Sequence, residues 1–221
     1  MKKNRGVRYA LATAAGKDAT LALHRARLDG LDVPFALSIY DPASQRIRFH
    51  GTRKELVEAQ TAALGLELLA LPAGPDEFEP VFLDGLSKLK AMGAGGIVFG
   101  NIHLADVRAW YEERSKAAGL LHLEPLWGQR PGELVREVIA LGYRPTIVSV
   151  DLAQGDAAWA GRELSLALVL EMEKRGADPC GERGEYHTFV ADGPLFHSPV
   201  RVQTGETKEQ NGHRLVDLVP R

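Results

Sequence analysis

The sequence has few of the features that mark secreted, membrane or strongly charged proteins. It contains one cysteine, Cys180, which excludes an internal disulfide framework and favours a reducing compartment. The apolar run at residues 7–15 is too short to span a membrane. It leads into Gly16-Lys17-Asp18 and an amphipathic segment, which favours a first strand and its turn over a secretory signal. We therefore expect a cytoplasmic protein that is not held in a membrane.

The chain also lacks a strong net charge, internal repeats and low-complexity tracts. Its formal net charge of −2 provides no general attraction for nucleic acid or for an acidic membrane surface. Hydrophobic residues make up 45% and charged residues 25% of the 221 residues, which are ordinary globular values. This length suits one large α/β domain with a small appendage.

Short apolar runs alternate with segments of helical period through the first two thirds of the chain. We expect strands over residues 7–13, 33–40, 67–71, 96–102 and 146–150. We expect helices over residues 17–29, 52–64, 76–92, 104–118 and 131–141. This alternation predicts a doubly wound parallel sheet of about five strands, with helices on both faces. Ligands bind such sheets beyond the carboxyl ends of the strands, which selects the loops that follow residues 13, 40, 71, 102 and 150.

The alternation ends after Asp151. Residues 163–174 are apolar on most sides, which predicts a buried helix or one that contacts a second copy of the chain in a homodimer. Residues 175–196 are rich in glycine, proline and polar residues, and two short strand-like pieces follow. We therefore divide the chain into an α/β domain at residues 1–151 and a small α+β extension at residues 152–221.

The loop at residues 14–19, Ala-Ala-Gly-Lys-Asp-Ala, joins the first strand to the first helix. A turn of this kind directs backbone N–H groups and a helix N-terminus at one point, which favours an anion site. Gly16 permits close approach and Lys17 adds positive charge. Leu11 and Asp18 occupy the positions where a kinase-type P-loop has glycine and Ser or Thr, so this is not such a loop. From these residues alone, a simple turn with a surface lysine remains the alternative.

Two further segments carry candidate binding residues, and the first of them lies on the expected ligand side of the sheet. The first follows the fourth strand and contains Gly100, Asn101, Asp106, Arg108 and Glu112. Arg108 and Glu112 lie one helical turn apart, so a surface ion pair worth about 0.5 kcal/mol is the alternative to a binding role. The second segment, at residues 124–128, contains Trp127, which suits either a pocket wall or the core.

Residues 178–190 form the most distinctive segment, which we call the late motif. Its glycines punctuate a loop that presents two carboxylates, a thiol, an imidazole and a hydroxyl: Cys180, Gly181, Glu182, Gly184, Glu185, His187 and Thr188. This mixture suits binding and proton transfer, and a structural turn held by acidic caps is the alternative. A Cys180–His187 nucleophile is disfavoured because no orienting group or oxyanion site is indicated. A zinc site is disfavoured because there is no second cysteine.

Together these segments resemble the diphthine–ammonia ligase family of PP-loop ATP pyrophosphatases along almost the whole chain. Residues 14–19 resemble the family's Ser-Gly-Gly-Lys-Asp-Ser loop, with alanine at 14, 15 and 19. Residues 180–188 resemble Cys-Gly-Glu-Asn-Gly-Glu-Phe-His-Thr, with Arg183 and Tyr186 as the differences. Asn101 stands where the family has aspartate, whereas Asp151 and the Gly161-Arg162 pair match.

The resemblance implies ATP with Mg²⁺, an acyl-adenylate, and amide formation with ammonia on a carboxylate, in the family a diphthine of an elongation factor. It implies catalytic roles for Lys17, Asp18, Glu182, Glu185 and His187, with Asp18 also holding Mg²⁺. It implies nucleotide contacts from Ala14, Ala15, Gly16, Lys17, Asp18, Ala19, Tyr40, Gly100 and Asn101. It implies substrate contacts from Asp106, Arg108, Glu112, Trp127, Arg162, Cys180, Gly181, Gly184 and Thr188.

The departures in the first loop leave other functions open. Two hydroxyl donors to phosphate are absent, and each such hydrogen bond is worth about 1.5–3 kcal/mol. Reduced ligase activity, or a nucleotide-binding protein without catalysis, is therefore an alternative. An RNA-modifying PP-loop enzyme is a third, disfavoured by the net charge of −2 and the lack of paired cysteines.

Overall fold

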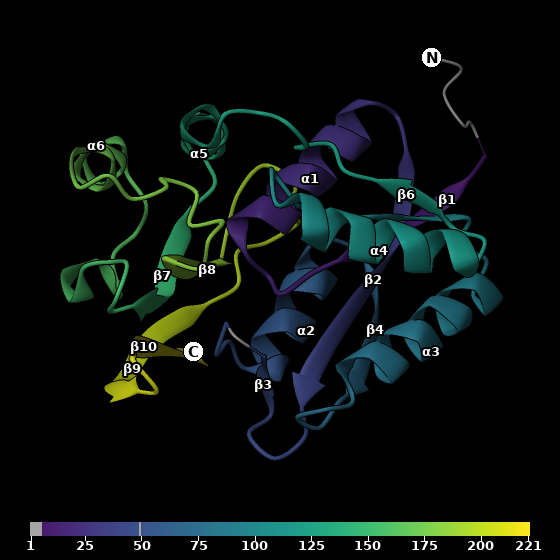
Figure 1. Ribbon diagram of the computed structural model, residues 1–221, viewed down its shortest axis with the longest axis horizontal. Helices are drawn as coiled ribbons and strands as arrows, with labels where there is room; N and C mark the ends of the chain where they lie inside the picture. The colour runs from purple at the N-terminus through teal and green to yellow at the C-terminus, as the bar shows by residue number, and fades with distance from the viewer. Residues whose placement is uncertain (1–5, 49) are drawn as a thin grey trace.

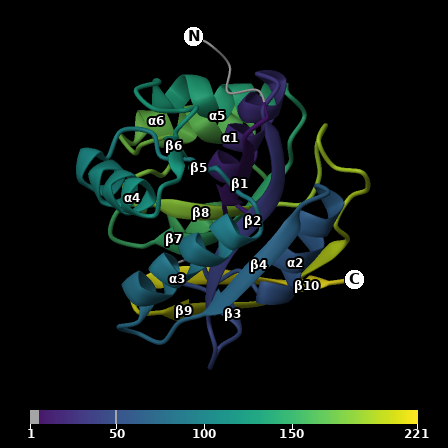
Figure 2. The same ribbon diagram turned by 90° about the vertical axis from the view of Figure 1, so that its right-hand side faces the viewer.

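The strands of the chain form two β-sheets, the first from its N-terminal part and the second from its C-terminal part (Figure 1). The structure is a computed structural model that describes residues 6–48 and 50–221. The first sheet contains β1 (Arg8–Ala12), β2 (Asp32–Asp41), β3 (Arg46–Ile47), β4 (Glu67–Pro72), β5 (Gly96–Val98) and β6 (Leu121–Leu123). The second sheet contains β7 (Pro145–Asp151), β8 (Tyr186–Val190), β9 (Val202–Gln210) and β10 (His213–Pro220). Figure 2 shows the strands of the second sheet running crosswise to β2 and β4.

The first sheet has the order β3-β2-β1-β5-β6, and β4 also pairs with β2. All of its pairings are parallel except that of the short β3. The connecting helices are α1 (Lys17–Leu28), α2 (Lys54–Ala63), α3 (Phe78–Ala91) and α4 (Ala105–Ala117). The predicted doubly wound parallel sheet is therefore confirmed.

Alternation along the strands explains why helices cover both faces. Tyr9 and Leu11 of β1 pack in one core with apolar residues of α1, whereas Ala10 packs in the other with Phe82 and Leu86 of α3. Successive side chains of a strand point to opposite faces, so one buried strand supplies both cores. The parallel strands then end at one edge, where the loops that carry the candidate residues meet.

The five helices predicted before residue 142 are confirmed, with ends within two residues of the structure. The last of these is α5 (Pro131–Ala140), with proline in its first turn. β5 is shorter than predicted, because residues 99–102 form a loop at the site. The apolar helix α6 (Leu166–Lys174) begins three residues later than the predicted start at residue 163. Its N-cap is Ser165, whose side chain accepts a hydrogen bond from Leu168 N.

One strand lies in a different sheet from the one predicted. Residues 146–150 were expected in the parallel sheet, but β7 pairs antiparallel with β8 and β10 in the second sheet. That prediction was wrong because β7 is central and buried on both faces, which produces the same continuous apolar run as a parallel strand. The fifth parallel strand is the three-residue β6. The second sheet thus begins before Asp151, and our division of the chain into an α/β domain and a C-terminal extension at that residue remains a proposal.

The late motif contains more regular structure than predicted. The loop expected there ends at Glu185, and residues 186–190 form β8.

α6 buries Leu168, Val169 and Met172, whereas Leu166 and Leu170 are about half exposed. Over residues 6–48 and 50–221, no helix combines the length and the apolar character needed to cross a membrane.

Candidate functional site

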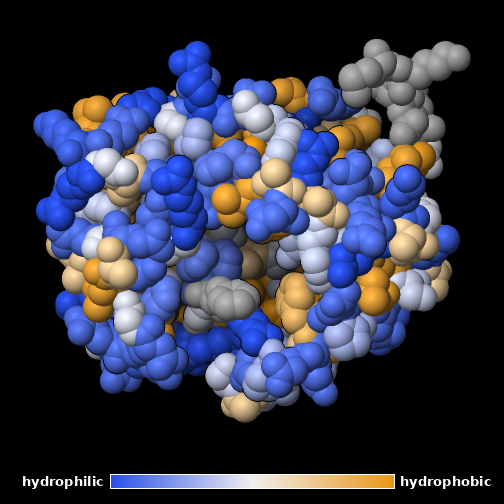
Figure 3. Space-filling model, in the orientation of Figure 1, coloured by the Kyte–Doolittle hydropathy of each residue, from blue (hydrophilic) through white to orange (hydrophobic). Residues whose placement is uncertain are grey.

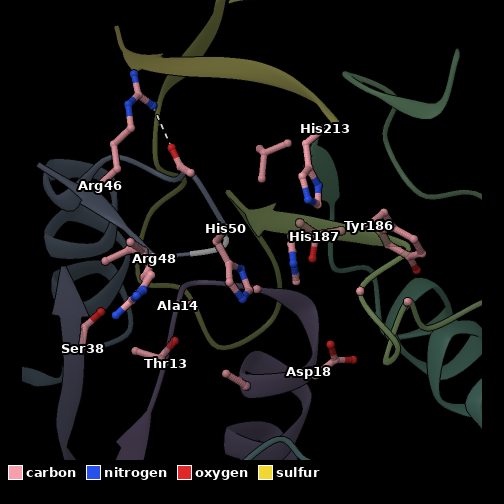
Figure 4. A pocket seen from close by; sticks show the side chains of 18 of the residues that line it. Thr13, Ala14, Asp18, Ser38, Arg46, Arg48, His50, Tyr186, His187 and His213 are labelled. Carbon is pink, nitrogen blue, oxygen red and sulfur yellow. Dashed lines mark hydrogen bonds between the residues drawn. The ribbon is translucent and has the colours of Figure 1, made fainter. Parts of the chain in front are cut away.

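A cavity of about 1220 Å³ opens between the carboxyl ends of β1, β2 and β5 and the facing second sheet. The surface is hollowed near the centre of Figure 3, where both hydrophilic and hydrophobic side chains border the hollow. The lining combines residues from both ends of the chain, as the close view in Figure 4 shows. Predicted residues in the lining are Ala14, Gly16, Lys17, Asp18, Ala19, Gly100, Asn101, Gly181, Glu182, Gly184, His187 and Thr188.

The first loop has the conformation that a glycine at position 15 would favour. Ala15 is buried and has a φ of 64°, in the left-handed region, at a cost of about 1–2 kcal/mol. Its N–H donates to Thr13 Oγ1 at 2.9 Å, and its carbonyl accepts from Gln60 Nε2 at 2.9 Å. Val190 N donates to the same carbonyl at 3.0 Å. These bonds hold the alanine in an unfavourable conformation, and Gly16 then begins α1 as its N-cap.

Lys17 joins the first loop to the late motif. Its backbone N–H donates to Thr188 Oγ1 at 3.1 Å, and its ammonium donates to Asp18 Oδ2 at 2.9 Å and to the Cys180 carbonyl. The ammonium also lies 4.9 Å from the centre of the Tyr186 ring. Lys17 is 2% exposed, so the alternative of a surface lysine is wrong. Burial is the largest single influence and opposes its charge, but the charge of Asp18 and the hydrogen bond to it favour the charged form. The net effect holds the pKa of Lys17 above its ordinary value, so the side chain stays charged.

Gly100 lets the end of β5 approach the first turn of α1. A Cβ at position 100 would lie 2.7 Å from the carbonyl carbon of Asp18 and 2.8 Å from Ala19 N. Both atoms belong to the backbone, so a side chain here forces the strand and the helix apart. Next to it, Asn101 Nδ2 donates to Glu124 Oε1 at 2.8 Å. This pair connects the cavity wall to a buried carboxylate.

Glu182 is the carboxyl group of the late motif that reaches the cavity. Its Oε1 accepts from Ile102 N at 2.9 Å, which ties the motif to the loop after β5. Burial raises the pKa of Glu182 to about 7, and the neighbouring Asp18 charge adds to the effect. Glu182 is therefore divided between its acid and its base form at neutral pH.

Glu185 and Cys180 lie behind the cavity wall. The Glu185 carboxylate accepts from Asp178 N at 3.2 Å and from Arg183 N at 3.1 Å, so it shapes its own loop. The Cys180 thiol is buried and donates to the Pro131 carbonyl at 3.0 Å. Burial raises the pKa of the Cys180 thiol, which keeps it protonated. These contacts give both residues structural partners rather than contacts with the cavity.

Histidines that the sequence did not single out surround His187. The rings of His187 and His50 stack with centres 4.2 Å apart and an interplanar angle of 28°. His213, on β10, also lines the cavity beside them (Figure 4). Burial lowers the pKa of His187 to about 4 and that of His50 well below its ordinary value, and the Lys17 charge adds to both shifts. His50 and His213 stand alone in the sequence, so no motif indicated them.

A second polar cluster lies beside the cavity and contains the expected Arg108, Glu112 and Trp127. Arg108 Nε lies 3.2 Å from Glu124 Oε2 and 3.7 Å from Glu112 Oε2. Its guanidinium stacks 4.4 Å from the Trp127 ring centre. The structure therefore brings these three residues together around the buried Glu124, and Asn101 connects Glu124 to the cavity.

The other predicted residues lie outside the cavity lining. Asp106 is exposed in the first turn of α4. Arg162 Nη1 pairs with Glu171 Oε2 at 3.1 Å on the surface. The Tyr40 ring lies 5.3 Å from the Lys54 ammonium. An aromatic wall that no motif indicated also lines the cavity: Phe78, Phe82, Phe99 and Tyr111.

The described residues do not form a preformed metal site. Across residues 6–48 and 50–221, no group of three or more His, Cys, Asp or Glu side chains is arranged to hold an ion. Asp18, the expected Mg²⁺ ligand, already pairs with Lys17. A metal ion here would need most of its ligands from a bound molecule or from water.

The family models and the curated relatives that match this chain indicate one family. One solved structure is similar in outline: a predicted subunit of tRNA methyltransferase from Methanocaldococcus jannaschii, with a TM-score of 0.47, 15% identity, and coverage of 83% of this chain and 95% of that chain. The diphthine–ammonia ligase of Rattus norvegicus is 34% identical over 115 residues, 50% of this chain and 43% of that protein. That of Danio rerio is 29% identical over 143 residues, 62% of this chain and 55% of that protein.

The chain thus spans about half the length of the curated relatives that it matches. The model of the diphthamide synthase N-terminal domain matches residues 7–122, and the model of the diphthamide synthase C-terminal domain matches residues 130–218. Both domain models match in chain order, and the N-terminal model alone covers more than half of the sequence. This chain belongs to the diphthine–ammonia ligase, or diphthamide synthase, family.

Proposed function

We propose that this chain is an ATP-dependent ligase that activates a carboxylate as an acyl-adenylate and transfers the acyl group to ammonia. One observation carries the proposal: Lys17 joins the first loop to the late motif at the edge of the parallel sheet, beside one cavity. A loop that suits phosphate and a motif that suits proton transfer therefore face the same space.

The first loop would hold the phosphates of ATP. The N-terminus of α1 and the backbone N–H groups there favour an anion, and Lys17 adds a fixed positive charge. As the substrate carboxylate attacks the α-phosphorus, the bond to pyrophosphate breaks and negative charge moves onto the leaving group. Positive charge placed there in advance stabilises that transition state.

Mg²⁺ would enter with ATP. Magnesium at nucleotide sites is usually held by substrate phosphates, water and one or two carboxylates, which fits a cavity that has Asp18 and Glu182 beside the loop. When bound, Mg²⁺ would neutralise part of the phosphate charge.

Glu182 would accept a proton during the second step. Ammonia attacks the acyl carbon, the C–O bond to AMP breaks, and the nitrogen loses a proton to a nearby base. A carboxylate with a pKa near 7 is suited to that transfer at neutral pH. The matched relatives are named diphthine–ammonia ligases, so diphthine on an elongation factor is the substrate we propose.

The test is release of AMP and pyrophosphate from ATP, Mg²⁺ and ammonium, with and without an elongation factor that carries diphthine. We expect release that depends on both the carboxylate and ammonium. An ATP analogue with a methylene group between the α- and β-phosphorus should bind without releasing AMP. Binding of ATP with no AMP release under any of these conditions would favour the nucleotide-binding alternative instead.

The variant that tests the role of Glu182 in the chemical step is Glu182→Gln. It keeps the size of the side chain and an acceptor for Ile102 N, but it cannot take up a proton. We expect it to lower turnover about 100-fold, in the range typical of a lost general base, while ATP binds within about threefold of the unchanged protein. Equal turnover would remove Glu182 from the mechanism.

A further inference from the structure

The reaction steps proposed above use none of His50, His187 and His213, although the family resemblance implies a catalytic role for His187. The three side chains come from the segment before α2, from β8 and from β10, and all of them line the cavity. Figure 4 shows the paired rings of His50 and His187 between the strand that carries His213 and the loop that carries Ala14. Nδ1 of His50 and Nδ1 of His213 are buried and have no hydrogen-bond partner within the described part of the chain. Buried polar atoms of this kind indicate a missing partner.

The stacked pair lies directly over the first loop. A Cβ built on Gly16 would lie 3.6 Å from His50 Cε1 and 3.3 Å from the Thr188 carbonyl oxygen. The His50 ring is therefore close to the backbone whose N–H groups favour an anion. The two loop positions that would carry hydroxyl donors in the resembling family are Ala14 and Ala19.

We propose that His50 and His187 bind the polyphosphate of ATP through their ring N–H groups and take the place of the hydroxyl donors absent at positions 14 and 19. The proposal rests on the proposed function only in naming ATP as the source of that polyphosphate. His213 lines the same cavity beside the pair and completes the wall of imidazoles.

The local charge favours an anion over ammonium as the partner of these rings. Lys17 is buried beside them and stays charged, and its positive field opposes protonation of both rings. The same field repels an ammonium ion and attracts a phosphate. A neutral imidazole always retains one N–H donor, so the pair can contact phosphate without first gaining a proton. A metal held by the three rings does not fit, because the described histidines are not arranged around a common point.

The experiment measures dissociation constants of ATP, inorganic pyrophosphate and AMP by calorimetry for the full chain and its variants. His50→Phe and His187→Phe each keep a stacking ring but remove the ring N–H groups. We expect ATP and pyrophosphate to bind at least about tenfold more weakly in each, the effect of one lost hydrogen bond to a charged group. AMP should bind within about threefold of the unchanged protein, because it lacks the β- and γ-phosphates that ATP and pyrophosphate offer to the histidines.

Three control variants separate binding from folding. His197→Phe makes the same change at an exposed histidine and should leave all three constants unchanged. His50→Gln and His187→Gln retain a side-chain N–H donor, so we expect them to recover part of the lost affinity. Recovery by glutamine is a result that general damage to the fold does not produce.

The outcomes distinguish this inference from the proposed function. If the phenylalanine variants bind ATP and pyrophosphate as the unchanged protein does, the histidines are not phosphate ligands, whether or not AMP is released. If pyrophosphate binding depends on the histidines but the unchanged protein never releases AMP, the inference stands and the ligase proposal fails. Absence of ATP and pyrophosphate binding in the unchanged protein would overturn both.

Discussion

The Lys17 ammonium donates a hydrogen bond to the carbonyl of Cys180, 163 positions later in the chain. This bond and the Lys17 N–H bond to Thr188 fasten the late motif to the first loop. Lys17 therefore has a structural part in the site besides the positive charge that it offers to phosphate. Its loss should be visible in stability, apart from any effect on turnover.

We predict that Lys17→Met lowers the free energy of unfolding by about 3 kcal/mol, measured by urea denaturation. Removing one partner of a buried ion pair leaves the other charge without compensation. Adding Asp18→Asn in the same chain should recover about 1 kcal/mol, because the unpaired carboxylate is then removed. If Lys17→Met unfolds at the same urea concentration as the unchanged protein, the tie is not important for stability.

Substitution of Gly100 should disturb the start of α1. Gly100→Ala places a methyl group 2.7 Å from the Asp18 carbonyl carbon, and we expect a loss of about 2–3 kcal/mol in unfolding free energy. Gly205→Ala is the matched control, since its nearest neighbour would lie 3.4 Å away on an exposed strand. We expect that control to change stability by less than about 0.5 kcal/mol. Equal effects of the two variants would mean that the contact at Gly100 relaxes freely.

Glu182 and His187 should give the stability opposite dependences on pH. Between pH 4 and 6.5 the folded His187 is neutral while the unfolded residue is protonated, so its contribution to stability falls as the pH falls. Between pH 4.5 and 7 the folded Glu182 keeps a proton that the unfolded residue has lost, so its contribution falls as the pH rises. Each effect is worth at most about 3.5 kcal/mol, at about 1.4 kcal/mol per pH unit.

The two effects are separated by single variants, with urea denaturation measured from pH 4.5 to 7. Relative to the unchanged protein, Glu182→Gln should lose stability more steeply on acidification, and His187→Gln should lose less or gain. The sign of each difference is the decisive quantity. Parallel pH curves for all three proteins would contradict the burial that shifts these pKa values.

The side chain of Asn101 is neutral and donates a hydrogen bond to the buried carboxylate of Glu124. Asn101→Asp replaces the 2.8 Å donation with repulsion between two acids, and we expect a loss of about 2 kcal/mol at pH 8. Asn101→Ala removes only the hydrogen bond and should cost about 1 kcal/mol. The difference in unfolding free energy between the two variants should disappear towards pH 4, where the introduced acid and Glu124 can share a proton. A gap that does not vary with pH would mean that charge repulsion is not its cause.

Much of the first sheet could be predicted because its elements are coded locally. Helices such as α1 and α3 carry their apolar stripes and their terminal glycines within one short stretch of sequence. The three-residue β6 could not be found, because it is too short to show a period. The sheet that contains β7 could not be predicted either, because burial on both faces leaves no mark of strand direction.

The candidate site divides in the same way. The first loop and the late motif are contiguous runs of residues, so their glycines, charges and order are visible in the sequence. Glu182 and Glu185 are equivalent there, but folding turns one towards the cavity and the other into its own loop. His50 and His213 carry no local signal, and they reach His187 only because the second sheet closes over the first loop.

By itself, the sequence determined the family resemblance, the parallel sheet and the loop suited to phosphate, because these depend on residues that are neighbours along the chain. Only the tertiary structure decided that Lys17 is buried in a tie to Cys180, that Glu182 is the carboxyl group at the cavity, and that imidazoles stand over the first loop. Burial, and the charges that surround a buried group, arise from contacts between distant segments and exist only once the two sheets have packed together.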